Sequence, residues 1–240
     1  SVFERYRSQI DITLRSALDD NNSPAYQILK YALGWVDKSG SRIQTQQGKR
    51  LRPTLCLLAC EATGGTPAQA LPAAAALEFI HDFSLIHDEI QDRDETRHHR
   101  PTIWTIWGDA KALVAGNILR LVADIAIWDL PDTKNTRNPN LNLAIRLTEA
   151  YLEMIEGQYL DLYYEGRHDI AVENYMEMIS RKTGALIRCS LVAGALIGTQ
   201  KPEILQAFDV SGRAFGMVFQ IRDDYLGIWG QESATGKPVG

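Results

Sequence analysis

Two aspartates, Asp88 and Asp92, close a long apolar stretch in the segment HDEIQD. On a helix, residues four apart share one face, so their carboxylates would point the same way. Like charges at this spacing repel, and a helix C-terminus disfavours anions, so a cation usually offsets such a pair. Carboxylates with no cysteine close by suit a hard ion such as Mg²⁺. An isolated pair is more often a solvated helix end, but the apolar residues before this one predict a helix that enters the interior.

A second acid pair, Asp223 and Asp224, follows another apolar segment, AFGMVF. Either pair alone is weak support for a metal site. Two pairs at the ends of two buried helices could face each other across the cavity of a helix bundle, as metal sites in bundles do. The sequence therefore favours a Mg²⁺ site over two unrelated charged helix ends.

Basic residues gather in short segments that would complement such ions. Lys49, Arg50 and Arg52 lie in GKRLRP, at a loop-to-helix junction where free backbone N–H groups also favour an anion. The spacing is not that of a Walker loop. Arginine forks suit phosphate oxygens, and lysines act as point charges. Any one basic segment is best interpreted as a solvated patch, but the combination with two acid pairs indicates a diphosphate site. The other basic segments are RHHR (97–100), RKTG (181–184) and TGKPVG (235–240).

Helical periodicity dominates the elements that would position these residues. Near the N-terminus, Phe3, Tyr6, Ile10, Leu14 and Leu18 recur at steps of three or four. We predict an all-α fold: a single bundle of long, mostly antiparallel helices around a central cavity, forming one domain over residues 1–240. Similar patterns cover residues 24–37, 50–64, 67–93, 109–129, 140–167, 171–199 and 202–229, and no β-type alternation is found.

Composition excludes several classes of protein. The net charge of −5 argues against nucleic-acid binding, which usually needs a basic face. Three cysteines without a CxxC pair predict no disulfide framework and fit a reducing, cytoplasmic location. The most apolar run, residues 189–198, is far shorter than the roughly 20 residues that span a bilayer. We therefore expect a soluble protein without stable membrane insertion.

The motifs, taken in order, resemble those of the trans-isoprenyl diphosphate synthases, or polyprenyl synthetases. GKRLRP is similar to GGKRxRP, with Gln47 in place of the first glycine. HDEIQD is similar to the first aspartate-rich motif, DDxxD, and RHHRPT to RRGxPT. GQYLDL (157–162), RKTGAL and FQIRDD…TGKPVG are similar to the later motifs. The resemblance covers nearly the whole chain and implies the isoprenoid synthase type of helix bundle.

The resemblance also implies a role for each matching residue. Asp88, Asp92 and Asp223 would bind Mg²⁺, three ions in all, and with Lys182 form the catalytic group. Asp161 and Asp224 would support the metal site. The substrate-binding residues would be Arg97, Lys182, Thr183, Gln220 and Lys237 around the allylic diphosphate and metal, and Lys49, Arg52, His81 and His98 for isopentenyl diphosphate.

Three departures from the family pattern bear most on the site. Glu89 replaces the second aspartate of the first motif, and it lies off the Asp88/Asp92 face, so we expect a small effect. Gly227 stands where many members have the last aspartate of the second motif, and some members share this glycine. His98 replaces an arginine that usually meets isopentenyl diphosphate, which predicts weaker binding unless Arg100 compensates.

Product length is suggested by two residues on the helix of the first motif. Phe83 lies five residues before Asp88, and the small Ser84 lies four before it. In this family an aromatic residue at that depth often forms the floor of the product tunnel, although Phe83 could equally be a core residue. The resemblance thus favours a C20 product, with C15 next. Family members also continue beyond the position of Gly240, so we expect the chain to lack their C-terminal helices.

Three functions compete. The first is a Mg²⁺-dependent prenyltransferase that condenses an allylic diphosphate with isopentenyl diphosphate, which the resemblance implies would be a homodimer. The second is a class I terpene synthase or cyclase, which ionises a diphosphate but needs no isopentenyl diphosphate. The third is a non-catalytic subunit of a heteromeric synthase. Lys49, Arg52 and His81 favour the first, and retention of both acid motifs disfavours the third.

Overall fold

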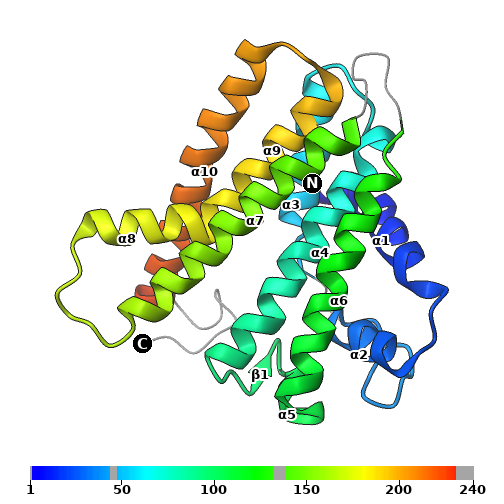
Figure 1. Cartoon of the computed structure of the whole chain (residues 1–240), viewed down its shortest axis with the longest axis vertical. Helices are drawn as coiled ribbons and strands as arrows, with labels where there is room; N and C mark the ends of the chain where they lie inside the picture. The colour runs from blue at the N-terminus through cyan, green and yellow to red at the C-terminus, as the bar shows by residue number, and fades with distance from the viewer. Residues whose placement is uncertain (1, 44–47, 132–138, 231–240) are drawn as a thin grey trace. The chain divides into compact units, whose positions relative to one another are not determined.

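The computed structural model describes residues 2–43, 48–131 and 139–230 (Figure 1). The chain divides into two compact units. Unit 1 comprises residues 1–57 and 67–131, and unit 2 comprises residues 58–66 and 132–240. Helices dominate both, so the prediction of an all-α fold is confirmed. The prediction of a single domain over residues 1–240 stays a prediction.

Unit 1 is built around two long helices, α4 and α6, which pack along each other. Small residues are buried on both helices, among them Ala73, Ala76 and Ala112. Gly116 of α6 lies directly against α4, because a Cβ there would lie 2.4 Å from His87 Nε2. Helices α1, α2 and α5 pack against this pair. The elements are α1 (Val2–Asp19), α2 (Pro24–Ala32), α3 (Leu51–Ala62, shared with unit 2), α4 (Pro67–Gln91), β1 (Thr96–Arg97), β2 (Arg100–Pro101), α5 (Ile103–Trp107) and α6 (Asp109–Trp128).

The apolar stripe of α1 is buried as the sequence predicts. Tyr6, Ile10, Leu14 and Leu18 are each at most 2% exposed, whereas Phe3 is half-buried. Complete burial of one such side chain is worth about 1.5–3 kcal/mol, so this stripe is what holds α1 on unit 1. Most of its contacts are with α4.

Unit 2 surrounds α9, a helix that is buried on nearly every side. It packs against α7 and α10, which lie beside it in Figure 1. An all-round apolar sequence such as ALIRCSLVAGALIG is typical of a helix enclosed by others. The elements are α7 (Pro139–Tyr164), α8 (Val172–Ile179), η1 (Ser180–Gly184), α9 (Ala185–Gly198) and α10 (Pro202–Trp229).

The segment predicted as one helix over residues 171–199 is interrupted. Its middle, Ser180–Gly184, forms a π-helical turn between α8 and α9. Such single turns insert an extra residue into a helix and are frequent at functional sites. Periodicity could not reveal this turn, because the apolar pattern continues through it.

A short hairpin, which the periodicity did not predict, contains the RHHR segment. Arg97 in β1 pairs with Arg100 in antiparallel β2, and His98 and His99 form the two-residue turn. Both histidines have positive φ, +49° and +60°. Two successive left-handed residues match the twist of a tight hairpin, so the turn fixes the positions of both flanking arginines.

The described residues include no helix that is long and apolar enough to cross a membrane. Cys56, Cys60 and Cys189 are all buried and free.

Candidate active site

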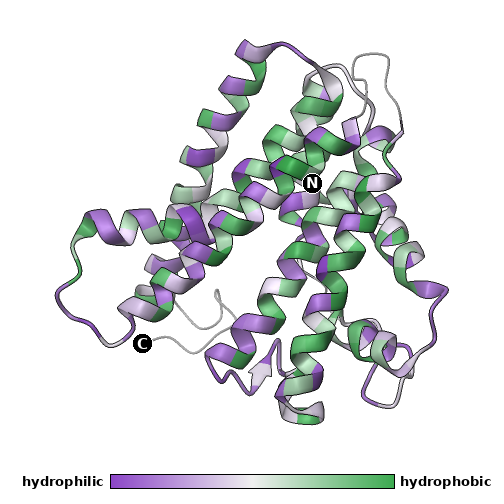
Figure 2. Cartoon of the chain, viewed as in Figure 1, coloured by the Kyte–Doolittle hydropathy of each residue, from purple (hydrophilic) through white to green (hydrophobic). Residues whose placement is uncertain are grey.

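Asp88 and Asp92 lie where α4 ends. The helix stops at Gln91, but the Asp92 N–H still donates to the Asp88 carbonyl at 2.8 Å, so the two residues stay one helical turn apart. Arg93 then adopts a left-handed φ of +56°, and the Asp94 N–H donates to the Glu89 carbonyl. This is the Schellman arrangement, which ends a helix abruptly. Figure 2 shows the hydrophilic end of α4 leading into β1.

The turn after the acid pair is anchored from α5 and α6. Arg93 Nη1 donates to both carboxylate oxygens of Asp109, at 3.0 and 2.9 Å, and the Arg93 guanidinium lies over the Trp104 ring. The Trp104 indole N–H donates to the Asp94 carbonyl at 2.9 Å. These contacts fix the chain that connects the acid pair to the hairpin.

Glu89 points away from the Asp88/Asp92 face and is buried. Its Oε1 forms an ion pair with Arg97 Nε at 3.1 Å. Burial raises the pKa of Glu89 to about 7, and Arg97 partly opposes that rise. Glu89 therefore holds Arg97 against α4, which is a role that the sequence did not suggest for this departure from the family motif.

Lys49, Arg52 and His81, the residues predicted to bind isopentenyl diphosphate, all belong to unit 1. Lys49 is exposed, whereas Arg52 and His81 are half-buried. Burial lowers the pKa of His81 well below its usual value, and the nearby Arg52, Arg97 and Arg50 lower it further. His81 is thus a neutral imidazole at pH 7 and would offer a hydrogen bond rather than a charge.

Arg52 has an unused hydrogen-bond donor. Its Nε is buried and has no partner among the described residues. Burial lowers the pKa of Arg52, while the nearby carboxylates of Glu78 and Asp82 oppose this shift. A buried donor without a partner costs about 1–3 kcal/mol, and an anion bound here would remove that cost.

The Arg100 side chain is held by the protein itself. The structure therefore does not favour the expectation that Arg100 binds isopentenyl diphosphate in place of the arginine that His98 replaces. Its guanidinium donates to the carbonyl oxygens of Tyr31 at 3.2 Å and Val36 at 2.9 Å, and it lies over the Tyr31 ring. His98 itself is exposed in the hairpin turn.

In unit 2 an ion pair joins two of the predicted residues. Lys182 Nζ donates to Asp161 Oδ2, which links the π turn to α7. Both side chains are partly exposed, at 27% and 39%, so they remain accessible to a ligand. The pair places a cation beside the carboxylate that the family resemblance assigns to metal support.

A hydrogen-bonded chain joins three more predicted residues and one that was not predicted. Thr183 Oγ1 donates to Gln220 Oε1 at 2.6 Å, and Gln220 Nε2 donates to Asp224 Oδ1 at 2.7 Å. The hydroxyl of Tyr175, on α8, donates to Asp224 Oδ2 at 2.6 Å, and burial raises the pKa of Tyr175. Both oxygens of Asp224 therefore already accept hydrogen bonds, which suits a supporting residue better than a metal ligand.

Asp223 lies beside this chain on α10 and is 44% exposed, with Arg222 Nη1 at 3.6 Å. Lys237, the last of the predicted diphosphate ligands, lies outside the described residues. The structure thus brings together Lys182 with Asp161, and Thr183 with Gln220 and Asp224. The roles assigned to all of these residues stay predictions.

Phe83 and Ser84 lie on α4, one turn before the acid pair. Phe83 is 5% exposed, and its ring lies 4.4 Å from that of His87, close to Gly116 of α6. The Ser84 hydroxyl donates to the His81 carbonyl at 2.8 Å. This burial suits both a tunnel floor and a core residue, so the chain-length assignment stays a prediction.

Two structural residues of this region escaped the sequence reasoning. Gly157 of α7 packs so closely on the π turn that a Cβ there would lie 2.1 Å from the Lys182 backbone nitrogen. Gly157 is the first residue of GQYLDL, and that motif was the signal that could have found it. Tyr175 had no comparable signal, because nothing in its local sequence marks a partner 49 residues away.

The acidic residues of both units include carboxylates that suit a magnesium ion. Among the described residues, no group of three or more His, Cys, Asp or Glu side chains is placed to hold one. Mg²⁺ usually keeps several waters and binds through one or two carboxylates plus phosphate oxygens. The paired carboxylates of Asp88 and Asp92 fit that requirement in unit 1, and the accessible carboxylate of Asp223 fits it in unit 2.

A separate pocket of about 620 Å³ lies in unit 2 and contains none of the predicted site residues. Its lining includes Glu153, Glu156 and Glu177, but Arg181 pairs with the last two and Arg188 with the first. These three glutamates are thus already paired with arginines. Since no predicted site residue lines the pocket either, it is not assigned as the active site.

Comparison with known proteins decides the family. The polyprenyl synthetase family model matches residues 34–240. This chain belongs to the polyprenyl synthetase family. Solved relatives share the fold: a polyprenyl synthetase from Streptomyces coelicolor A3(2) superposes with a TM-score of 0.92 at 36% identity, covering 99% of this chain and 69% of that one.

Curated relatives include synthases of different products. The chain is 40% identical to a (2E,6E)-farnesyl diphosphate synthase of Mycobacterium tuberculosis, a match that covers 95% of this chain and 62% of the relative. It is 34% identical to a geranylgeranyl diphosphate synthase of the same organism, covering 100% and 67%. The polyprenyl synthetase chain thus spans about two thirds of the length of these relatives.

Proposed function

We propose that the protein is a Mg²⁺-dependent trans-prenyltransferase that joins an allylic diphosphate to isopentenyl diphosphate. The observation that carries the proposal is the linkage of the later motifs in unit 2, where Lys182 pairs with Asp161 and Thr183 is connected through Gln220 to Asp224. Residues from three separate sequence motifs meet there, as a diphosphate and metal site requires. Family membership and the two curated synthases support the same reaction.

Asp88 and Asp92 would hold Mg²⁺ in unit 1, and Asp223 would hold it in unit 2, with three ions expected in all. Bound Mg²⁺ would stabilise the departing diphosphate and so promote ionisation of the allylic C–O bond. Arg97, Lys182 and Lys237 would bind the same diphosphate, with Thr183 nearby. Asp161 would keep Lys182 in place, and Gln220 with Asp224 would keep Thr183 in place, through the hydrogen bonds that they already form.

Isopentenyl diphosphate would be held by Lys49, Arg52 and His81. Arg52 Nε, which has no partner in the part of the chain that the structure describes, would donate to an anion, and neutral His81 would add a hydrogen bond without a desolvated charge. The C=C bond, held close to the allylic carbon, would attack it, and a proton would then pass to the departing diphosphate. The reaction therefore needs no side-chain base.

A C20 product is proposed, with C15 next, because Phe83 is a buried aromatic residue one turn before the acid pair. A homodimer is also proposed. Exposed apolar residues on α6 support it, among them Leu121 at 61%, Ile125 at 62% and Trp128 at 62% exposure.

Analytical sedimentation of the full-length protein tests the dimer. A mass of two chains is expected, and a mass of one chain would contradict the dimer. A cytoplasmic location stays a prediction.

One incubation separates the competing functions. The full-length protein is mixed with Mg²⁺, labelled isopentenyl diphosphate and, in separate reactions, geranyl diphosphate or farnesyl diphosphate, and the products are identified. Label in a longer diphosphate is expected, and its length tests the role of Phe83 as a floor. An unlabelled hydrocarbon would indicate a terpene synthase, and no turnover would favour the non-catalytic subunit.

A further inference from the structure

Arg50 lies at the junction between a loop and α3, between the predicted ligands Lys49 and Arg52. Its backbone has a left-handed φ of +52°. This conformation costs a residue with a side chain roughly 1–2 kcal/mol, so surrounding contacts must hold it. The Arg50 carbonyl accepts the Thr54 N–H at 3.0 Å, which makes Arg50 the residue from which α3 begins.

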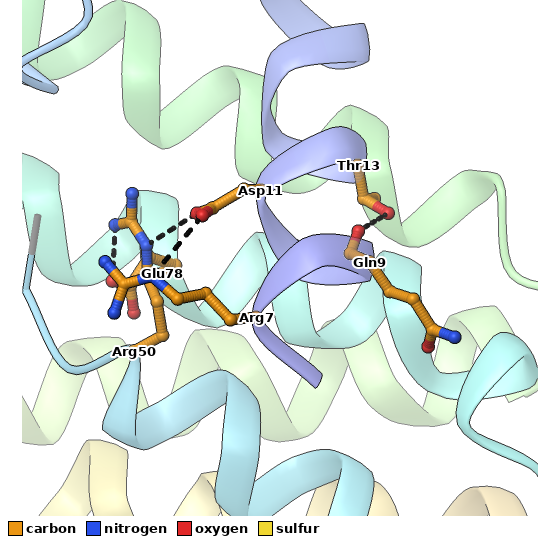
Figure 3. Close-up of polar contacts among 6 residues, drawn as sticks. All are labelled: Arg7, Gln9, Asp11, Thr13, Arg50 and Glu78. Atoms are coloured by element: carbon orange, nitrogen blue, oxygen red, sulfur yellow. Dashed lines mark hydrogen bonds and ion pairs between the residues drawn. The ribbon is translucent and has the colours of Figure 1, made fainter. Parts of the chain in front are cut away.

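The Arg50 side chain is held from two other helices (Figure 3). Its Nη1 donates to Glu78 Oε1 of α4 at 2.8 Å, and its Nε donates to Asp11 Oδ1 of α1 at 3.2 Å. The side chains of Arg50 and Glu78 are only 5% and 6% exposed, while that of Asp11 is 26% exposed. One planar guanidinium therefore ties the start of α3 to α1 and α4 in two directions at once.

Such a buried pair is a poor source of stability, because the loss of hydration offsets much of the charge attraction. It does fix geometry, since Nη1 and Nε of one planar group donate in fixed directions to two different carboxylates. Lysine carries the same charge but has one nitrogen and no fork, so it cannot reproduce both contacts. What the contacts fix is the backbone from which Lys49 and Arg52 project.

We propose that Arg50 is a positioning residue for isopentenyl diphosphate: pinned by Glu78 and Asp11, it sets the backbone that presents Lys49 and Arg52 to that substrate. The proposal places Arg50 outside the binding set, because its Nη1 and Nε already donate to the two carboxylates. The inference rests on the proposed function, since it takes the ligand to be that of Lys49 and Arg52. The new element is that the affinity for one substrate depends on a residue that does not itself bind it.

The test is Arg50→Lys in the full-length protein, with both substrates titrated separately. We expect the KM for isopentenyl diphosphate to rise about tenfold, with kcat and the KM for the allylic diphosphate changed less than about twofold. Arg7→Lys is the matched control, because Arg7 is also an arginine facing Asp11, at 3.7 Å, but is 37% exposed and far from the junction in sequence. An equal change in both KM values, or no change, would overturn the proposal.

Calorimetric titration with isopentenyl diphosphate alone separates this proposal from the reaction. If the wild type binds it but makes no product, the proposed function fails, while an unchanged Kd in Arg50→Lys still overturns the positioning role. If the wild type binds none, both fail. Should Arg50→Lys not fold, Asp11→Asn keeps the Glu78 contact and is expected to weaken binding about threefold. An unchanged Kd there would also overturn the proposal.

Discussion

His99 adopts a left-handed backbone that costs energy for most residues. Its φ of +60° lies in the hairpin turn, and the family motif RRGxPT has glycine at this position. His99→Gly should therefore stabilise the protein by about 1 kcal/mol, since glycine adopts this conformation freely. For a chain of this size that corresponds to a rise in Tm of about 2–4 °C in thermal denaturation.

Thr96→Gly provides the control for that prediction. Thr96 is exposed in β1 of the same hairpin and has no positive φ. Glycine there should lower stability by roughly 0.5–1 kcal/mol, because it increases the conformational entropy of the unfolded chain without relieving any strain in the folded one. If both variants shift Tm in the same direction, the strain at His99 is not what limits the hairpin.

Asp82 is a buried carboxyl group that no part of the proposed reaction uses. Its Oδ2 has no partner among the described residues, and burial, with Glu78 nearby, raises its pKa to about 7. Arg50, Arg52 and Arg97 also face it and partly oppose the rise. Between about pH 4 and pH 7 the folded chain thus holds a proton that the unfolded chain has released.

Stability should consequently fall as pH rises through that window, by up to about 1.4 kcal/mol per pH unit from this group. Asp82→Asn removes the group and should make the free energy of unfolding fall less steeply. Urea denaturation of both proteins at pH 5, 6 and 7 measures the two slopes. Identical slopes would contradict the raised pKa.

The π turn is the element on which the predicted diphosphate ligands of unit 2 depend. Gly157 of α7 touches it, and a Cβ at this position would lie 2.1 Å from the Lys182 nitrogen and 2.6 Å from its Cα. Both contacts are to backbone, so Gly157→Ala must push the turn away from α7. We expect kcat/KM to fall at least about tenfold, with stability reduced by roughly 1–3 kcal/mol.

Gly227→Ala serves as the stability control for the same change. A Cβ on Gly227 of α10 would have no atom of the described residues within 4 Å, so alanine there should be neutral or stabilising by up to about 1 kcal/mol. A Gly157→Ala protein with normal activity and a Tm like that of Gly227→Ala would show that the close contact does not position Lys182.

The long helices could be predicted from the sequence because their apolar residues repeat with the helical period. The prediction for residues 202–229 matches α10, and those for α4 and α6 extend only one or two residues too far. The π turn, the short helix α5 and the hairpin could not be predicted in this way. Each is set by local backbone geometry or by contacts with distant helices, such as Gly157 against Lys182.

At the scale of the molecule, the sequence identified which residues carry charge but not which charges neutralise each other. The spacing of Asp88 and Asp92 was enough to place both on one turn of α4. By contrast, the contact of Glu89 with Arg97 joins a helix to a strand. The contacts of Arg50 with Glu78 and Asp11 join segments that are far apart in the sequence. Such contacts depend on how the helices pack, and one sequence does not reveal that.

The carboxylates of the first acid motif are proposed to bind the metal that activates an allylic diphosphate. Asp88→Ala removes one of them, and Asp129→Ala removes an exposed aspartate at the end of α6 as the control. The deciding measurement is incorporation of labelled isopentenyl diphosphate into a longer diphosphate with Mg²⁺ present. We predict that the wild type and Asp129→Ala incorporate the label. Asp88→Ala should lose roughly a thousandfold in the rate of incorporation, with an unchanged Tm. Near-normal incorporation by Asp88→Ala would contradict the account.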